Sequence, residues 1–87
     1  MKVPGIDLML DIDLAILGTD RARFEDYERQ VRLEYAHIPD AAFARARASF
    51  LTALLGKAIY RTDVARSELE GKAQENLMRA LKVWSAA

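Results

Sequence analysis

The chain contains no cysteine, only two prolines and four glycines, and no long uninterrupted apolar run. Without cysteine there can be no disulfide framework and no thiolate metal site. A membrane helix needs about 20 predominantly apolar residues, so we expect no transmembrane segment. The opening MKVPGIDLML has one lysine, then proline and glycine, and acidic residues interrupt its apolar stretch. We therefore expect no signal peptide and a cytoplasmic location.

An excess of charge of one sign is also missing. Thirteen basic residues balance thirteen acidic ones, so the formal net charge is zero. This balance removes the general attraction to phosphates on which nucleic-acid binding depends, and we expect no nucleic-acid partner. A content of 52% hydrophobic and 30% charged residues is typical of a globular protein. With 87 residues the chain makes one small domain whose core is modest, so partners often add stability.

The pattern of the chain predicts helices and no strands. No segment alternates between polar and apolar residues with a period of two, and no hairpin dipeptide occurs. Glycine and proline mark the expected ends of helices at Gly18, Pro39 and Gly56. Within one domain, residues 1–87, we expect helices at residues 6–17, 20–37, 40–55 and 63–84. The expected N-caps are Thr19 or Asp20, then Asp40, then Thr62.

Apolar residues recur at helical spacing in the last three segments. The predicted core stripes are Phe24, Tyr27, Val31 and Tyr35; then Phe43, Ala46, Phe50, Leu51 and Leu54; then Leu69, Ala73, Leu77, Ala80, Leu81 and Trp84. Ile59 and Tyr60 are expected to hold the connector at residues 57–63 against the core. The predicted fold class is therefore all-α, a small four-helix bundle.

The first predicted helix, IDLMLDIDLAIL, is apolar on nearly all sides. Such a helix belongs inside a larger structure, and three short companions would struggle to surround it. We therefore expect self-association, as a homodimer, or a protein partner to complete the bundle. The predicted interface residues are Leu10, Leu14, Leu17 and Trp84. Among the aromatic residues, Tyr60 and Trp84 are those expected to reach a partner surface.

Two acidic residues, Asp11 and Asp13, interrupt this apolar helix. On a helix, residues two apart point about 200° away from each other, so these two cannot chelate one ion together. One interpretation is that one carboxylate faces solvent while the other binds a helix N-terminus or an arginine. The other is a metal ligand that a partner completes. If both were buried without partners, their pKa values would rise.

Three phrases together carry a resemblance to a known family: DIDLAILG, YERQVRLEY ahead of Pro39, and IYRT before the last helix. Over residues 7–81 the chain resembles the C-terminal portion of the predicted metal-dependent HD-superfamily phosphohydrolases. The resemblance implies a helical fold and a divalent metal held by a histidine, a His-Asp pair and a distant aspartate. By that similarity the distant aspartate is Asp13, with Asp11 as the alternative.

The chain departs from this family at the other ligands. Its one histidine, His37, is not followed by aspartate and comes after Asp13 in the sequence. A divalent site for phosphoryl chemistry needs several ligands and open positions for water and substrate, which one histidine and two diverging carboxylates cannot supply. We therefore expect no catalytic residue, no cofactor and no metal in the isolated chain. The alternative is a subunit of a metal-dependent phosphohydrolase that contributes one aspartate to a site completed by another chain.

The remaining polar residues have structural interpretations. His37 is expected in the last turn of the second helix, where a cation gains from the helix dipole. Glu25 and Arg29 have the favourable order for an ion pair. Six arginines could bind phosphate but are expected on solvated faces or in intramolecular pairs: Arg21, Arg23, Arg29, Arg32, Arg45 and Arg47. The predicted function is a non-catalytic interaction module that acts through protein–protein contact, as a regulator, an inhibitor or an inactive truncated relative.

Overall fold

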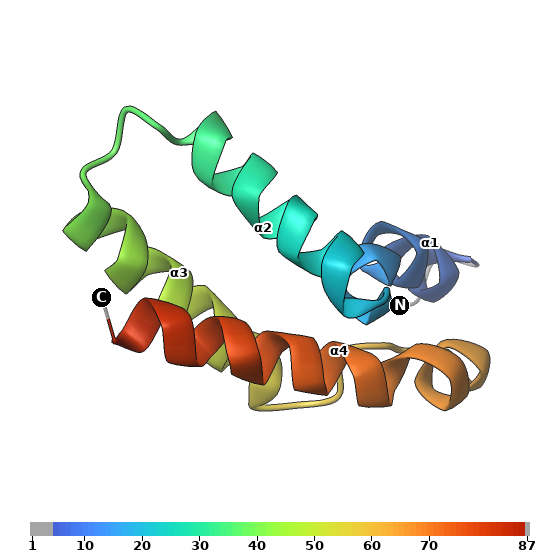
Figure 1. Ribbon diagram of the computed structural model, residues 1–87. Coiled ribbons are helices and arrows are strands. Elements are labelled where there is room, and N and C mark those ends of the chain that lie inside the picture. Colours follow the sequence, from blue (N-terminus) through green and yellow to red (C-terminus); the bar gives the residue numbers. More distant parts are fainter. Residues whose placement is uncertain (1–4, 87) are drawn as a thin grey trace.

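The computed structural model describes residues 5–86, with the side chains of residues 6–9 outside the description. Its elements are α1 (Ile6–Asp13), the 3-10 helix η1 (Ala15–Gly18), α2 (Arg21–Glu34), α3 (Asp40–Leu55) and α4 (Asp63–Ser85). The prediction of an all-α fold with four α-helices is confirmed for this part of the chain (Figure 1). None of the described helices combines the length and the apolar character that crossing a membrane requires.

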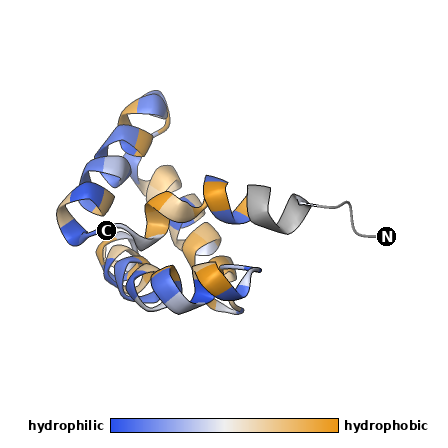
Figure 2. Cartoon of the chain, turned by 90° about the vertical axis from the view of Figure 1, so that its right-hand side faces the viewer, coloured by the Kyte–Doolittle hydropathy of each residue, from blue (hydrophilic) through white to orange (hydrophobic). Residues whose placement is uncertain are grey.

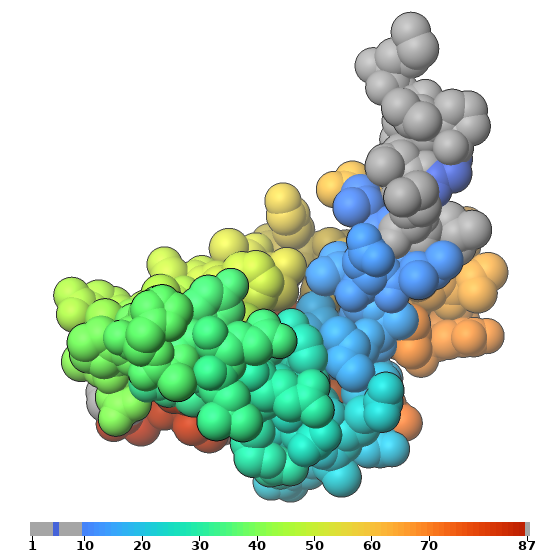
Figure 3. All heavy atoms as spheres, turned by 90° about the horizontal axis from the view of Figure 1, so that it is seen from above, coloured from blue at the N-terminus to red at the C-terminus, as the bar shows by residue number. Residues whose placement is uncertain are grey.

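The long helix α4 is the base of the fold. α3 runs antiparallel along it and η1 packs on it, whereas the backbone of α2 approaches η1 and stands off from α3 (Figure 1). Seen from above, α2 lies over the body, and the end of α1 lies beside the first turns of α4 (Figure 3). Apolar residues lie mainly on the inner sides of the helices (Figure 2). This arrangement leaves the space between α2 and α3 open.

The core lies where η1, the start of α2, α3, α4 and the connector before α4 meet. Its buried members are Leu17, Phe24, Leu51, Ile59, Tyr60, Ala73, Leu77 and Ala80. The stripe predicted on the last helix is confirmed, because its remaining members pack against this core. The predicted role of Ile59 and Tyr60 is confirmed too, since their exposed fractions are 5% and 1%. Burying one large apolar side chain contributes about 1.5–3 kcal/mol, so the connector is firmly held.

The first predicted helix is interrupted, and the expected span of residues 6–17 is wrong at its end. α1 ends at Asp13, and after Leu14 the chain tightens into η1. The carbonyl of Leu14 accepts the Tyr60 hydroxyl at 2.8 Å and the amide of Leu17 at 3.0 Å. Gly18 is buried against α4, where an added Cβ would lie only 2.8 Å from the Cβ of Leu69. The break therefore follows from contacts with Tyr60 of the connector and Leu69 of α4.

The second helix ends at Glu34, three residues before the predicted end. Arg32 explains this early end, because its guanidinium donates to the carbonyls of Tyr35 at 2.9 Å and Ile38 at 3.0 Å. These bonds satisfy carbonyls that a continuing helix would otherwise use. His37 therefore lies in the turn after the helix, exposed, and its predicted place in the last helical turn is wrong.

Two of the predicted N-caps are confirmed. The Asp20 carboxylate accepts the amide of Arg23 at 3.0 Å, and the Thr62 hydroxyl accepts the amide of Ala65 at 3.3 Å. Asp40 is not a cap, because it is the first residue of α3 and its carboxylate pairs with Arg32 at 2.6 Å.

The core face of α3 differs from the predicted stripe. Phe43 and Leu51 are buried as expected, but Ala46 is exposed and Phe50 is 46% exposed. Arg47 is buried in their place. The face of α3 that carries Ala46 and Phe50 thus turns toward the open space below α2.

Candidate functional site: a groove between α2 and α3

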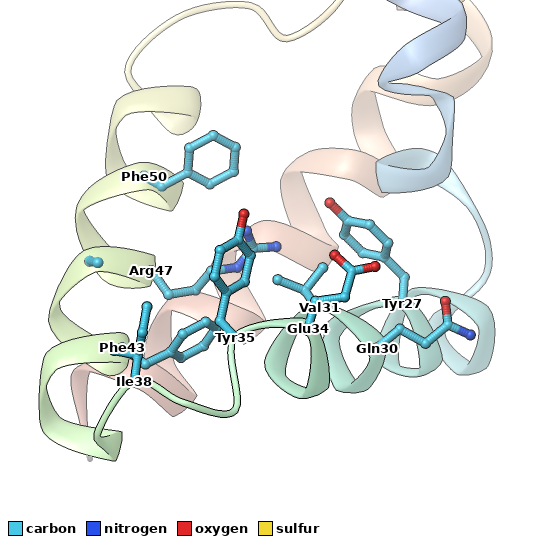
Figure 4. A pocket seen from close by; sticks show the side chains of 10 residues that line it. Tyr27, Gln30, Val31, Glu34, Tyr35, Ile38, Phe43, Arg47 and Phe50 are labelled. Carbon is cyan, nitrogen blue, oxygen red and sulfur yellow. The ribbon is translucent and has the colours of Figure 1, made fainter.

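A groove of about 610 Å³ lies between α2 and α3 (Figure 4). Side chains from both helices and from the turn between them line it: Tyr27, Gln30, Val31, Glu34, Tyr35, Ile38, Phe43, Ala46, Arg47 and Phe50. Its volume falls within the range of roughly 300–1,000 Å³ that is usual for binding sites. Its walls are mostly apolar and aromatic with a few polar groups, which is also the usual character of such sites.

A buried ion pair joins α2 to α3 at the base of this groove. Arg47 donates two hydrogen bonds to the Glu28 carboxylate, from Nε at 3.2 Å and from Nη2 at 2.8 Å. The two side chains are only 9% and 11% exposed. Burial opposes the charge of Arg47, but the Glu28 carboxylate holds the pKa of this guanidinium above its usual value. Because the Trp84 indole also donates to Glu28, at 3.4 Å, this carboxylate links α2 to both α3 and α4.

Aromatic rings surround the ion pair. The guanidinium carbon of Arg47 lies 5.1 Å from the ring centre of Phe50 and 5.9 Å from that of Tyr27. Both distances are within the range of cation–π attraction. On the side toward α4, Phe43 meets Trp84 edge to face, with ring centres 5.0 Å apart. The charge at the base is therefore neutralised and enclosed, so the groove offers a partner an apolar surface.

The rim of the groove is open to solvent. Tyr35 is 48% exposed and Phe50 is 46% exposed, and Figure 4 shows both rings beside the cavity. Glu34 is exposed on the α2 side, and no cation in the described part of the chain pairs with it. The groove thus combines accessible aromatic surface with one negative charge that no described cation balances.

The two acidic residues of DIDLAILG have different environments. Asp13 is exposed, whereas Asp11 is 3% exposed and accepts bonds of 2.7 Å from the amide of Arg61 and from the amide and hydroxyl of Thr62. Burial alone would raise the pKa of Asp11, but these hydrogen bonds hold it below its ordinary value. The interpretation that one carboxylate faces solvent while the other binds a helix N-terminus is confirmed.

Neither acidic residue belongs to a metal-binding cluster in the described part of the chain. Among the described side chains, no three His, Asp or Glu residues gather closely enough to hold an ion. Both oxygens of Asp11 already accept hydrogen bonds, so an ion there would have to displace them. His37 follows α2, whereas α1 lies beside the start of that helix (Figure 1). The sole histidine therefore does not meet the Asp11–Asp13 segment.

A second carboxylate holds the same connector. Glu70 accepts the amides of Ile59 and Tyr60, each at 3.0 Å, so four consecutive amides, those of residues 59–62, bind two carboxylates. Burial, together with the charges of Glu70 and Asp11, raises the pKa of Tyr60 to about 12, so its hydroxyl stays protonated and donates to Leu14. With an exposed fraction of 1%, Tyr60 cannot reach a partner surface, and that prediction is wrong.

Asn76 is a structural residue that the sequence analysis missed. It is 3% exposed within α4, donates to the carbonyls of Leu17 at 2.9 Å and Thr19 at 2.8 Å, and accepts a bond from Arg79. These bonds satisfy carbonyls at the end of η1. A signal was present, since position 76 lies three residues after the buried Ala73 and four before the buried Ala80.

The predicted interface residues do not share one exposed face. Leu17 is 2% exposed and belongs to the core of the single chain, so its assignment to an interface is wrong. Leu10, Leu14 and Trp84 are half-buried and remain predictions. Among the described side chains of this segment, the large apolar residue that is exposed is Ile12, at 63%.

Four of the six arginines, Arg21, Arg29, Arg32 and Arg47, form intramolecular pairs, whereas Arg23 and Arg45 lie on exposed faces, as expected. Arg21 pairs with Glu25 at 2.8 Å, and Arg29 pairs with Asp26 at 3.1 Å. The predicted Glu25–Arg29 pair is therefore wrong. Glu25 instead pairs with Arg21, one helical turn earlier, and the hydrogen bond from Arg21 lowers the pKa of Glu25.

Comparisons with known proteins leave the family of the chain open. No family model, no curated protein and no solved structure matched it. The resemblance to the HD-superfamily phosphohydrolases thus remains a prediction from the residues. Within the fold, Asp11 of the DIDLAILG segment binds the backbone of the IYRT segment.

Proposed function

We propose that this chain is a non-catalytic helical interaction module that binds a protein partner in the groove between α2 and α3. The observation that carries the proposal is the groove's construction, with a neutralised base and the exposed rings of Tyr35 and Phe50. A partner helix in this position would complete the bundle that α2 leaves open. Regulation or inhibition of that partner is the role we infer.

The helical walls of the groove support this proposal. A groove between two helices is the usual receptor for an amphipathic helix, which inserts side chains spaced by one and two turns. Aromatic residues and arginine are also enriched at the centres of protein interfaces. Tyr27, Phe50 and Arg47 bring these residue types to one surface.

Asp11, Glu70 and Tyr60 have structural roles that agree with a non-catalytic module. A general acid or base works best with a pKa near the operating pH. The shifts in the described part run the other way: hydrogen bonds lower the carboxyl pKa values of Asp11 and Glu70 against the effect of burial, and burial raises that of Tyr60 to about 12. Each of these groups is engaged in holding the backbone of the connector or of α1.

An uncharged hydrophobic dye, Nile red, tests whether the groove accepts apolar groups. We expect the folded chain to enhance and blue-shift its fluorescence, and Ala46→Glu to reduce this signal severalfold because it places a charge in the groove. Ala41→Glu makes the same change at an exposed site of α3 outside the groove and should keep the signal. Circular dichroism verifies that both variants fold. Absence of dye binding, or equal loss in both variants, contradicts the proposal.

Titration with Mn²⁺ distinguishes the proposed interaction module from the alternative, a subunit of a metal-dependent phosphohydrolase. The proposal predicts no stoichiometric binding to the purified chain. Stoichiometric binding that disappears in Asp13→Ala would contradict it and favour a subunit that contributes an aspartate to a shared metal site.

A further inference from the structure

Glu34 gives the groove a chemical preference. It lies at the rim, exposed, and no described cation pairs with it, whereas the Arg47 charge is neutralised by Glu28. We propose that the occupant is an amphipathic helix of another protein, with an apolar stripe and a lysine or arginine beside it that pairs with Glu34. This inference rests on the proposed function and adds the chemistry of the partner.

The spacing of the groove residues fits a helical guest. From α2, Tyr27, Val31 and Glu34 project into the cavity (Figure 4) at steps of four and three residues. On α3, the lining residues Phe43, Ala46 and Phe50 follow steps of three and four. From its first to its last residue, each row covers seven steps along the helix, which is about 10 Å, or two helical turns. A guest would therefore insert apolar side chains at positions i, i+3 or i+4, and i+7.

Charge complementarity sets the guest's flanking residue. The guanidinium of Arg47 is occupied by two bonds to Glu28, and Gln30 is bonded to Asp26 at 3.3 Å. Glu34 is thus the charged residue of the groove lining that has no ion-pair partner among the described residues. Opposite charges at the rim of an interface favour the right partner and disfavour the wrong one.

Helices α2, α3 and α4 of a second copy do not supply such a guest. The large apolar residues that the described part exposes are Ile12, Leu33, Tyr35, Phe50, Val64, Met78 and Val83. Within α2, α3 or α4, no two of them are three, four or seven residues apart. Because these three helices expose no apolar stripe to insert, they are poorer occupants than a helix of a different protein.

Two designed peptides test this inference by fluorescence anisotropy. Both are stapled helices of about 16 residues, because unconstrained helices of that length are marginal in water. Both carry leucines at i, i+3 and i+7, and they differ only in one flanking residue, lysine or glutamate. We expect the wild-type chain to bind the lysine peptide roughly fivefold to twentyfold more tightly than the glutamate peptide.

Charge reversal at the rim provides the decisive comparison. Glu34→Lys should invert the preference, while Glu68→Lys, an exposed site on α4 outside the groove, should preserve it. Failure of the chain to bind either peptide, or a preference that Glu34→Lys leaves unchanged, overturns the inference. Both substitutions are at exposed positions, so we expect both variants to fold, and circular dichroism verifies this.

Light scattering after size exclusion tests whether a second copy of the chain, instead of a different protein, occupies the groove. A monomeric wild-type chain agrees with the inference. A dimer that Ala46→Glu converts to monomer would identify a second copy as the occupant and overturn it. If Nile red binds the groove but the peptide preference is missing, this inference fails while the proposed function stands. If Nile red does not bind, the proposed function itself fails.

Discussion

Asp11 and Thr62 lie 51 residues apart, yet the carboxylate of Asp11 accepts 2.7 Å hydrogen bonds from both the amide and the hydroxyl of Thr62. Thr62 is also the N-cap of α4, since its hydroxyl accepts the amide of Ala65. One carboxylate therefore ties α1 to the start of the longest helix. Charge-assisted bonds of this kind are about twice as strong as neutral ones, and burial excludes competing water.

Replacing Asp11 should therefore destabilise the fold. We expect Asp11→Ala to lower the free energy of unfolding by about 2–4 kcal/mol, because it leaves the amides of Arg61 and Thr62 without their acceptor. Asp13→Ala, at the exposed position two residues later, should change it by less than about 0.5 kcal/mol. Urea denaturation followed by circular dichroism measures both. Similar effects of the two substitutions would contradict the assigned role of Asp11.

The same contacts predict a loss of stability in acid. The folded-state pKa values of Asp11 and Glu70 lie below their ordinary values of 3.8 and 4.5, because hydrogen bonds outweigh burial. A lowered folded-state pKa stabilises the fold fully above the unfolded value, and this contribution disappears as the pH falls through the folded value. The free energy of unfolding should thus decrease below a pH of about 4.5.

The slope of this decrease identifies its source. Asp11→Asn should be less stable than the wild type at neutral pH and should show a shallower decrease between pH 4.5 and lower values. Urea midpoints measured across this range give the comparison. A variant whose slope equals that of the wild type would show that Asp11 titrates alike in the folded and unfolded states.

Local signals in the sequence predicted much of the fold. The bounds of α3, residues 40–55, agree with the prediction, and α4 ends one residue later than expected. Asp20 and Thr62 cap their helices as predicted, because N-capping depends on residues within one turn. By contrast, the break after Asp13 depends on the Tyr60 hydroxyl 46 residues away. No local pattern could report that contact.

The groove was less accessible to prediction. On α3 the spacing of Phe43, Ala46 and Phe50 indicated one buried stripe, but periodicity does not say whether a neighbouring helix covers that stripe. α2 stands away from it, so Ala46 and Phe50 stay exposed. Arg47, one of six arginines expected on solvated faces or in intramolecular pairs, is paired and buried because Glu28 compensates its charge. Pairing of this kind becomes visible only in three dimensions.

Removing one member of the Glu28–Arg47 pair should lower the free energy of unfolding strongly, whereas replacing both members with apolar residues should lower it little. Arg47→Met leaves the Glu28 carboxylate buried without its cation, so we expect a loss of about 3–5 kcal/mol in the free energy of unfolding. Adding Glu28→Leu removes the uncompensated charge and should recover most of this loss. Chemical denaturation of the two single variants and the double variant completes a double-mutant cycle.

An exposed pair provides the control for this cycle. Arg21 and Glu25 are 70% and 47% exposed, and Arg21→Met should cost less than about 1 kcal/mol. A cycle with no coupling between Glu28 and Arg47 would contradict the view that this pair holds α2 against α3. It would also mean that the shape of the groove depends on packing alone.

Gly18 and Gly71 should respond in opposite directions to the same substitution. At Gly18 a new Cβ would meet the Cβ of Leu69 at 2.8 Å and the Tyr60 hydroxyl at 3.0 Å, so Gly18→Ala should destabilise the fold by about 1–3 kcal/mol. At Gly71, within α4, nothing lies within 4 Å of the new atom, and alanine should add about 0.5–1 kcal/mol through its higher helix propensity. Thermal melts measure both, since 1 kcal/mol corresponds to roughly 4–8 °C in a domain of this size. A stabilising effect at Gly18 would show that η1 does not need this close approach to α4.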